Sequence, residues 1–327
     1  AIALISPQGK ISRYFFGNDY PASDLGLGLI GVGEGKDGAV PDRIVARCER
    51  RKGRQPTAVE GHPLVGADGI HSTVRSILYP GEGPPIWNGT MLWRGATAWP
   101  VYVDGRTMVI AGGNAAKFVF YPIHMEPARP EMRLTNWAIM ARLSEGNAPP
   151  PRREDWNRIG QREEALPFVR DRFRLGFLDP VALIEATETF YEYPNCDRDP
   201  LPRWSFGRVT LLGDADHPMY AVGSNGASQA IVDAQRLAWH LKAVPSVTEA
   251  LAGYDAERRP AMAKIVVANR KGGPEGVIDL IEARALRRDF VIPKRSTFER
   301  TRRQTALAPT DLDIVEGSTV EVTAWQP

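Results

Sequence analysis

The spacing of hydrophobic positions changes abruptly after residue 212. Residues 209–212 form a short β-branched and apolar run, which predicts a buried strand. Apolar residues then recur at helical spacing over residues 227–241, which predicts an amphipathic helix. The loop between these two elements starts with Gly213 and Asp214 and ends in the glycine-containing segment 223–226. This strand, loop and helix form the clearest local pattern in the chain.

The polar residues of this loop have the chemistry of a ligand-binding site. Asp214 stands at the carboxyl end of the strand, where open α/β sheets bind their ligands, and a carboxylate accepts hydrogen bonds from hydroxyl groups. The loop then leads into the N-terminus of the helix, where unpaired backbone N–H groups and the helix dipole favour an anion. The pattern therefore predicts a ligand that carries hydroxyls and negative charge.

A similar but shorter pattern occurs upstream. Residues 64–66 predict a strand that leads into Asp68 and Gly69, and Ser72 is placed to N-cap a short helix that ends near Leu78. An Asp-Gly pair after a strand is often an ordinary turn.

The first 61 residues give weaker patterns. Residues 1–25 predict two strands around a turn at residues 7–9 followed by a loop, and residues 43–48 predict one further strand in an otherwise loop-like segment. Residues 26–31, GLGLIG, fit the G-x-G-x-x-G spacing of dinucleotide-binding turns. No strand pattern precedes them and no helix-forming segment follows, so a chance match or a flexible loop is the favoured interpretation.

Between residues 91 and 140 the pattern becomes alternating. Residues 107–111, 117–123 and 134–140 predict strands of an antiparallel sheet with one face towards a pocket. Five aromatic residues either line an aromatic substrate site or pack in the core: Trp93, Phe118, Phe120, Tyr121 and Trp137.

Further elements complete the chain. We expect a polar helix over residues 153–165 that is broken at Pro167, then a short helix and a strand within residues 179–193. Residues 247–254 and 257–269 predict two more helices.

Composition excludes several classes of protein. The chain has 327 residues, of which 43% are hydrophobic, and 41 Lys and Arg balance 39 Asp and Glu, which argues against nucleic-acid or membrane-surface binding. Cys48 and Cys196 are the only cysteines, so no disulfide framework is expected and a reducing cytoplasm is the simpler location. No leader segment and no apolar run of about 18 residues is found, so we expect no transmembrane helix.

Two strings resemble one enzyme family. GDADHPMYAVGSNGASQAI at residues 213–231 resembles the second flavin-contacting motif of the FAD-dependent aromatic monooxygenases of the para-hydroxybenzoate hydroxylase fold. LVGADGIHSTVR at residues 64–75 resembles the motif that this family shares between FAD and the nicotinamide cofactor. The resemblance is greatest to the phenazine- and salicylate-type hydroxylases and covers roughly residues 61–284.

The resemblance implies an α/β fold, with a doubly wound-type FAD-binding sheet and an antiparallel-sheet substrate domain. The FAD-binding sheet is expected to be incomplete, because the strand, G-x-G-x-x-G turn and helix that open the family's fold are not found. Residues 1–85 and 194–284 would form the FAD-binding part and residues 86–193 the substrate domain, followed by a tail of unclear order at residues 285–327. The implied activity is hydroxylation of an aromatic or heteroaromatic small molecule with FAD, NAD(P)H and molecular oxygen.

The resemblance also assigns cofactor-binding residues. Asp214 would hold the ribityl hydroxyls, backbone N–H groups near the start of the helix would stabilise negative charge on the reduced ring, and Asp68 and Arg75 would organise the loop near the pyrophosphate. His217 would have a structural place near the flavin. The full predicted set is Asp68, Gly69, Arg75, Gly213, Asp214, Gly223, Ser224, Asn225 and Gly226. The sequence identifies no catalytic residue, no metal-ligand spacing and no oligomeric state.

Two positions depart from the family pattern. Asp216 stands where a small residue is expected, and Ala221 replaces a proline that normally stiffens the loop. A buried charge is costly unless it is paired, and loss of proline frees a backbone torsion. These departures, the missing dinucleotide turn and the unfamiliar C-terminal segment leave an alternative: a non-catalytic or truncated relative that binds an aromatic ligand and holds FAD poorly.

Overall fold

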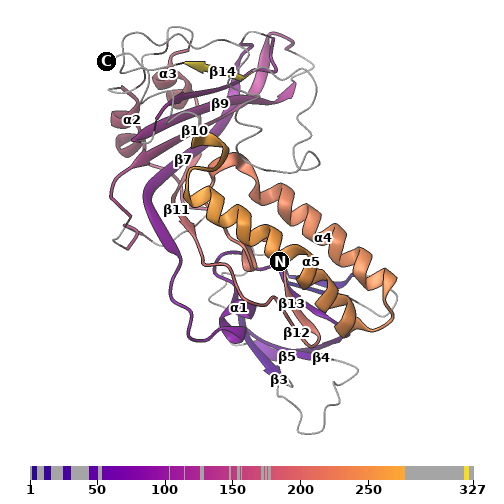
Figure 1. Cartoon of the computed structure of the whole chain (residues 1–327). Coiled ribbons are helices and arrows are strands. Elements are labelled where there is room, and N and C mark those ends of the chain that lie inside the picture. The colour runs from indigo at the N-terminus through magenta and orange to yellow at the C-terminus, as the bar shows by residue number, and fades with distance from the viewer. Residues whose placement is uncertain are drawn as a thin grey trace. The chain divides into compact units, whose positions relative to one another are not determined.

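The chain divides into two compact units, each described separately below (Figure 1). The computed structural model describes residues 2–5, 11–15, 25–30, 44–50, 54–276 and 320–323, with gaps at 103, 114, 126–128, 147–148, 153–154, 156, 171–172, 174 and 176–177. The first unit is formed by Ala1–Ile86 and Asp197–Lys271, and the second by Trp87–Cys196 and Gly272–Pro327. No described helix is both long enough and apolar enough to cross a membrane.

A five-stranded sheet forms the centre of the first unit. Its strands, in spatial order, are β12 (Ser205–Phe206), β13 (Val209–Leu211), β6 (Leu64–Gly66), β1 (Ile2–Ile5) and β2 (Ile11–Phe15). The β6–β13 pair is parallel and the other pairs are antiparallel. The two strands predicted before residue 25 and those predicted at residues 64–66 and 209–212 are therefore confirmed. The predicted turn at residues 7–9 and the loop after β2 lie outside the described residues.

A second, three-stranded antiparallel sheet consists of β3 (Leu25–Ile30), β4 (Ile44–Arg50) and β5 (Arg54–Gly61). Residues 25–30 form a strand, so the G-x-G-x-x-G spacing is a chance match, as favoured, and the alternative of a flexible loop is wrong. Leucine at every second position of LGLGLI is the period-two pattern of a strand, which the glycine spacing concealed. The strand predicted at residues 43–48 is confirmed as β4, whereas β5 was not expected.

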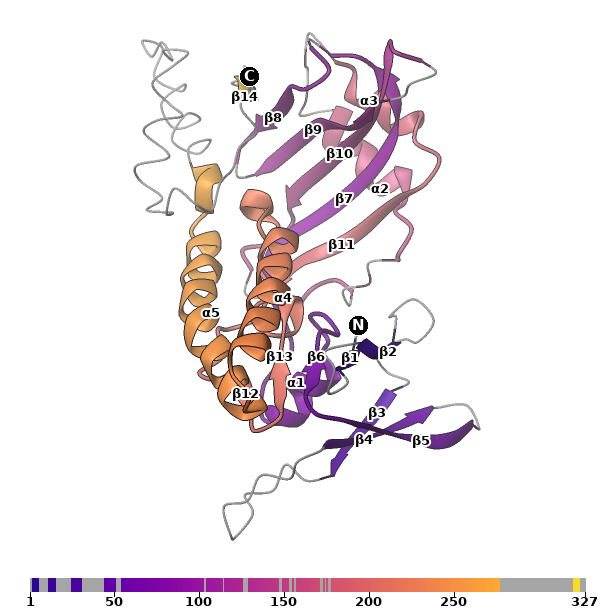
Figure 2. The same ribbon diagram turned by 90° about the vertical axis from the view of Figure 1, so that its right-hand side faces the viewer.

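Three helices complete the first unit: α1 (Thr73–Leu78), α4 (Gly226–Ala243) and α5 (Val247–Arg270). The long helices α4 and α5 lie side by side (Figures 1 and 2). The two helices predicted at residues 247–254 and 257–269 are one, because α5 continues through residues 255 and 256 and also through Pro260. Pro260 has no N–H to donate to the carbonyl of Ala256. Because both residues are exposed, water can hydrogen-bond to that carbonyl instead.

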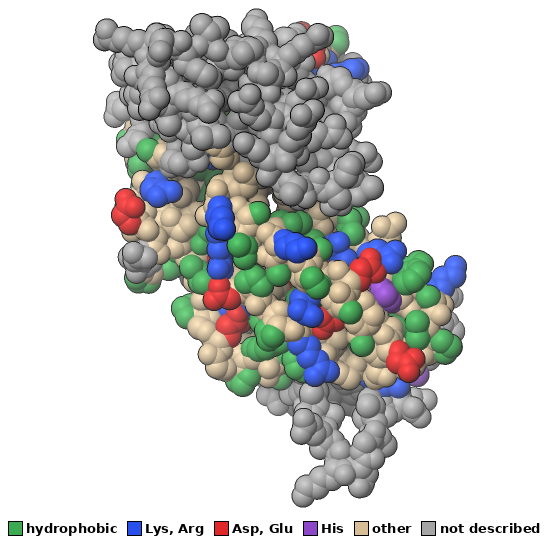
Figure 3. Space-filling view, in the orientation of Figure 1, with side chains coloured by type: hydrophobic (Ala, Val, Ile, Leu, Met, Phe, Trp, Pro, Cys, Tyr) green, Lys and Arg blue, Asp and Glu red, His purple; other side chains and the backbone are tan. Residues whose placement is uncertain are grey.

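The core of the first unit joins the two parallel strands to the helices. Leu64 and Leu211 are fully buried, and Leu251 and Tyr254 of α5 belong to the same apolar cluster. The view in Figure 3 includes the surface of α4 and α5, where hydrophobic and basic side chains are interspersed. The carboxyl ends of β6 and β13 are thus fixed by a packed core beneath them.

The second unit is built on a six-stranded sheet. Its spatial order is β11 (Phe190–Asp197), β7 (Ile86–Pro100), β10 (Met132–Arg142), β9 (Ala116–Met125), β8 (Met108–Gly112) and β14 (Val320–Thr323) (Figure 2). The ladders from β7 to β8 are antiparallel, and β14 runs parallel to β8. The predicted antiparallel sheet is confirmed, although the long strand β7 was not predicted. Apart from β14, the predicted tail at residues 285–327 lies outside the described residues.

Among its described residues this unit has two short α-helices, α2 (Arg162–Arg170) and α3 (Pro180–Glu185). The helix predicted over residues 153–165 is wrong over most of its length, because α2 begins only at Arg162 and runs through Pro167. The described residues before it are extended or irregular, and Ile159 forms a β-bridge with Tyr191. Pro167 has no N–H to donate to the carbonyl of Glu163. Because both residues are exposed, water can hydrogen-bond to that carbonyl.

Candidate functional site

The parallel pairing of β6 and β13 brings the two sequence motifs together. Leu211 pairs with Gly66, and the N–H of Leu212 donates to the Gly66 carbonyl at 2.9 Å. Because parallel strands have their carboxyl ends at the same edge, the turns that carry Asp68 and Asp214 start at that edge. This is the edge at which open α/β sheets bind ligands.

Arg75, in the helix that follows the first turn, connects the two turns. The side chain is buried, and its Nη1 donates to the carbonyl oxygens of Asp216 at 2.7 Å and Ala215 at 3.3 Å. Its Nε and Nη2 donate to the Glu82 carboxylate at 2.7 and 2.5 Å. Arg75 therefore holds the loop after β13 in place, and its buried guanidinium is committed to protein groups.

Asp68 binds the first N–H groups of α1. Its carboxylate accepts hydrogen bonds from the N–H groups of Thr73 at 2.7 Å and Val74 at 3.3 Å, and from the Ser72 hydroxyl at 2.5 Å. Ser72 is the N-cap, as predicted, and its hydroxyl accepts from the N–H of Arg75 at 2.9 Å. Gly69 lies in the turn before it and accepts from the N–H of Ser72 at 2.9 Å. Asp68 thus shapes this turn by capping a helix.

Gly213 and Asp214 follow the end of β13 and lie close to the first turns of α4. Gly213 has φ +65°, and a Cβ there would lie 3.2 Å from the Cβ of Ala230 in α4, so glycine permits both the turn and the close approach. A Cβ built on Gly226, the first residue of α4, would lie 3.9 Å from Oδ1 of Asp214. The exposed Asp214 carboxylate is therefore next to the N-terminus of α4. The protein packed around it raises its pKa by desolvation, and His217 partly opposes that shift.

The loop before α4 has an unusual backbone. Gly223 has φ +73°, and Ser224 has φ +52°, a left-handed conformation that costs energy for a residue with a side chain. Asn225 is the N-cap of α4, but its side chain makes no capping hydrogen bond. The first N–H groups of α4 are thus left without a side-chain cap, which suits the binding of an anion or an electronegative ring.

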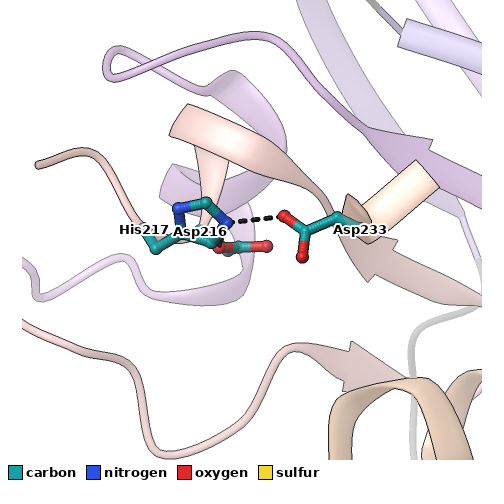
Figure 4. Close-up of side chains that lie close together, drawn as sticks. All are labelled: Asp216, His217 and Asp233. Carbon is teal, nitrogen blue, oxygen red and sulfur yellow. Dashed lines mark hydrogen bonds and ion pairs between the residues drawn. The ribbon is translucent and has the colours of Figure 1, made fainter. Parts of the chain in front are cut away.

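A buried polar network lies beneath this loop (Figure 4). Nε2 of His217 is 2.6 Å from Oδ2 of Asp233, and Oδ1 of Asp233 accepts from Nε of Arg258 at 2.7 Å. Arg258 also donates to Oε1 of Gln229 at 2.7 Å. His217 is buried, so it links the loop to α4 and α5, in agreement with a structural place. Sequence reasoning missed Gln229, Asp233 and Arg258, although polar residues four apart in a helix were the available signal.

The carboxylate of Asp216 lies beside this network but takes no part in its hydrogen bonds. Its side chain is buried, and neither carboxylate oxygen has a hydrogen-bond partner among the described residues. Oδ1 lies 3.4 Å from Nε2 of His217. Burial, and then the charge of Asp233, raise the pKa of Asp216 well above its usual value. The ligand atoms of Asp216, His217 and Asp233 lie within 4.8 Å of one another, close enough to share a cation, although Arg258 already supplies positive charge at Asp233.

The aromatic residues of the second unit divide between the two faces of its sheet. Trp93 stacks on Phe168 of α2 with ring centroids 5.3 Å apart, and Nε1 of Trp137 donates to Oγ1 of Thr187 at 2.8 Å. Phe118 and Phe120 are buried on the same side as these tryptophans. Core packing is therefore the role of four of the five candidates. Tyr121 alone of the five pairs with Asn136 on the opposite face.

Residues 189–269 match the family described as FAD binding domain. The chain is 41% identical, over 223 residues, to the phenazine 1,6-dicarboxylic acid hydroxylase PhzS of Lysobacter antibioticus, a match that covers 68% of this chain and 54% of that relative. It is 31% identical, over 237 residues, to 3-hydroxybenzoate 6-hydroxylase 1 of Aquipseudomonas alcaligenes, with 70% and 54% covered. The chain is a relative of the FAD-dependent aromatic monooxygenases.

Solved structures agree on the fold. The Klebsiella pneumoniae HpxO structure with FAD and uric acid matches with a TM-score of 0.58 at 20% identity, covering 80% of this chain and 62% of that one. The α/β fold that the resemblance implied is thereby confirmed. The chain spans about half the length of the two aromatic hydroxylases it matches, at 54% of each.

Proposed function

We propose that this chain binds FAD at the carboxyl edge of β6 and β13 and takes part in the hydroxylation of an aromatic or heteroaromatic small molecule with NAD(P)H and molecular oxygen. The observation that carries the proposal is the position of the exposed Asp214 carboxylate beside the N-terminus of α4, which no side chain caps. The two groups offer a hydroxyl acceptor and an anion site next to each other. This fits the ribityl chain and ring of a flavin.

The predicted residues then have distinct tasks. Asp214 accepts hydrogen bonds from ribityl hydroxyls, while the backbone of Gly223, Ser224, Asn225 and Gly226 presents N–H groups and the helix dipole to the electronegative side of the ring. Gly213 allows the close approach of strand and helix. Asp68, Gly69 and Arg75 hold the turns of the site in shape. Bound FAD supplies the redox and oxygen chemistry, and the protein supplies position and exclusion of water.

The relatives support the substrate class. Their names state that one hydroxylates phenazine 1,6-dicarboxylic acid and another 3-hydroxybenzoate, both of which are aromatic acids. We therefore propose an aromatic small molecule as the partner of this chain and a reducing cytoplasm as its location, in line with the buried Cys196, which forms no disulfide with another described residue.

A second candidate is a non-catalytic relative that binds an aromatic ligand but holds FAD poorly. The unpartnered Asp216 favours it, because a destabilised loop next to the flavin site weakens cofactor binding.

The absorbance spectrum of the purified protein after equilibrium dialysis against FAD separates the two candidates. Flavin bands in excess of the free FAD, together with NAD(P)H oxidation that an aromatic acid accelerates and a hydroxylated product by mass spectrometry, are the expected result. Aromatic-ligand binding without excess flavin bands and without NAD(P)H oxidation would favour the non-catalytic candidate.

A further inference from the structure

Three buried side chains of the metal-ligand type meet where the loop after β13 packs against α4 (Figure 4). Asp216 and His217 follow the turn at Gly213–Ala215, and Asp233 lies on α4. These three residues are at most 2% exposed, and one ligand atom from each lies within 4.8 Å of the other two. Among the described residues, no second cluster of three such side chains is found.

The hydrogen bonds of this cluster leave part of its polar surface unused. Within the part of the chain that the structure describes, both carboxylate oxygens of Asp216 and Nδ1 of His217 have no hydrogen-bond partner. Nearly all buried polar atoms of folded proteins have a partner, so a buried carboxylate without one indicates a partner from outside the chain, such as an ion.

The charge balance of the cluster favours a cation. Nε of Arg258 donates to Oδ1 of Asp233 at 2.7 Å, and so balances one of the two carboxylates. Arg75 donates to the backbone carbonyl of Asp216, but the ion pair of its side chain is with Glu82. The negative charge of Asp216 is therefore left for a cation to balance, because an unpaired buried charge is costly.

The spacing of the ligand atoms fits a tetrahedral ion. Nε2 of His217 lies 3.4 Å from Oδ1 of Asp216 and 2.6 Å from Oδ2 of Asp233. Two atoms that each bind a tetrahedral Zn²⁺ at about 2.0–2.2 Å are themselves about 3.3–3.6 Å apart. The first distance matches this range, and the second must lengthen by about 1 Å or less when an ion replaces the hydrogen bond. Arg258 would remain on the other oxygen of Asp233 and orient that carboxylate, as outer partners do in metal sites.

We infer that Asp216, His217 and Asp233 bind one divalent first-row metal ion such as Zn²⁺. An imidazole nitrogen beside two carboxylates selects such an ion over Mg²⁺, which prefers six oxygen ligands and keeps several waters. The ion joins the loop that carries Asp214 to α4 and gives the buried Asp216 its partner. The sequence shows no metal-ligand spacing here, because Asp233 is 16 residues from His217. The inference does not depend on the proposed function, since all three ligands belong to the protein.

Equilibrium dialysis of the chelator-treated chain against Zn²⁺, followed by elemental analysis of the protein, tests the inference with and without FAD. The dialysis must be long, because the cluster is buried and the loop has to open before an ion can enter. We expect one tightly bound Zn²⁺ per chain at about 1 µM free Zn²⁺, and a temperature of unfolding that rises with the Zn²⁺ concentration. Mg²⁺ at the same concentration should change neither quantity.

Asp216→Ala removes one ligand and should weaken Zn²⁺ binding at least about a hundredfold, because loss of a group that merely orients a ligand already costs about 10–100-fold. Asp216→Asn keeps the shape of the side chain and should also weaken binding, which covers the case in which alanine disturbs the fold. His240→Gln is the matched control. Nε2 of His240 lies 2.9 Å from Oε2 of Glu257, but the described residues place no second carboxylate beside it, so its loss should leave bound Zn²⁺ unchanged.

Four results would each overturn the inference: no Zn²⁺ bound by the unchanged chain, equal Zn²⁺ bound by the unchanged chain and both Asp216 variants, loss of the ion in His240→Gln, or equal retention of Mg²⁺. The dialysis with FAD keeps the two proposals apart. Zn²⁺ binding that requires Asp216 in a chain that binds no FAD supports the inference and counts against the proposed function.

Discussion

Asp68 and Asp214 have the same side chain and follow strands that pair in parallel, yet their surroundings give them different tasks. The carboxylate of Asp68 is used by two N–H groups and a hydroxyl at the start of α1. Asp214 is exposed beside an uncapped helix N-terminus. The family resemblance included both residues in the cofactor site and already gave them different tasks, but it did not predict that Asp68 caps α1, because capping depends on where the following residues fold.

Asp68→Ala should therefore lower the free energy of unfolding by about 0.5–2 kcal/mol, the usual cost of removing a helix cap. Asp214→Ala should leave stability nearly unchanged in the absence of flavin. Urea denaturation followed by circular dichroism measures both. A larger loss for Asp214→Ala than for Asp68→Ala would contradict these assignments.

Asp216 gives the protein a pH dependence of a definite sign. Its pKa in the folded protein is raised above the usual value of 3.8, by burial and by Asp233 and Asp214, against the opposing charges of Arg75 and Arg258. The folded state thus holds the proton more tightly than the unfolded state. The resulting stability is complete below about pH 4 and is lost as pH rises through the raised pKa.

Asp216→Asn removes this titration while keeping the shape of the side chain. The stability advantage of the variant should grow from about pH 4 upwards, by at most about 1.4 kcal/mol for each pH unit, and then become constant. Urea denaturation of both proteins at a series of pH values tests this. If the free energies of unfolding of the two proteins changed with pH in parallel, Asp216 would not be the source of the pH dependence.

The helix α4 shows what hydrophobic spacing can and cannot predict. Its existence followed from the spacing, but its buried side chains are Gln229, Asp233 and Leu237, while Ile231 is 71% exposed. The network of Asp233 with His217 and Arg258 decides which face is buried. An ion-paired carboxylate inside a core is not visible in a periodicity that counts only apolar residues.

Strands were predicted well where apolar and polar residues alternate and poorly elsewhere. β8, β9 and β10 have that alternation approximately, whereas residues 89–93 of β7 are buried in succession, so this part of β7 does not alternate. β5 contains Pro and Gly, which indicate a loop when they are considered without their partner strand. Pairing with neighbours, rather than local preference, forms these two strands.

The loop before α4 is already in a conformation that accepts proline at position 221. Ala221 has φ −65°, the value that a proline ring imposes. Ala221→Pro should therefore raise the free energy of unfolding by about 0.4–1 kcal/mol, because it restricts the unfolded chain. Urea denaturation provides the measurement.

Ala256→Pro is the contrasting control, since Ala256 lies exposed inside α5 and proline there should cost about 3 kcal/mol. A loss of stability in Ala221→Pro would show that the backbone around position 221 does not tolerate the ring.

For the molecule as a whole, family resemblance predicted more than local patterns did. Two motifs indicated the FAD-dependent aromatic monooxygenases, and the match of residues 189–269 to the FAD binding domain supports that reading. Residues 26–31 do not form a dinucleotide-binding turn, since their described part, residues 26–30, belongs to the strand β3.

Without that turn, the 327-residue chain should hold the flavin ring and ribityl chain more firmly than the pyrophosphate. We therefore expect FAD to bind with micromolar or weaker affinity, because each missing hydrogen bond to a charged group costs about 1.5–3 kcal/mol. Submicromolar affinity would show that another segment of the chain binds the pyrophosphate.

Titration of the apoprotein with FAD, followed by flavin fluorescence, in the unchanged chain and in Asp214→Ala and Asp68→Ala, tests the position of the cofactor most directly. The structure predicts that Asp214→Ala weakens binding about tenfold or more, since a hydrogen bond from the ligand to a carboxylate is lost, and that Asp68→Ala weakens it less. Equal FAD affinities in the unchanged chain and Asp214→Ala would contradict a flavin site at the carboxyl edge of β6 and β13.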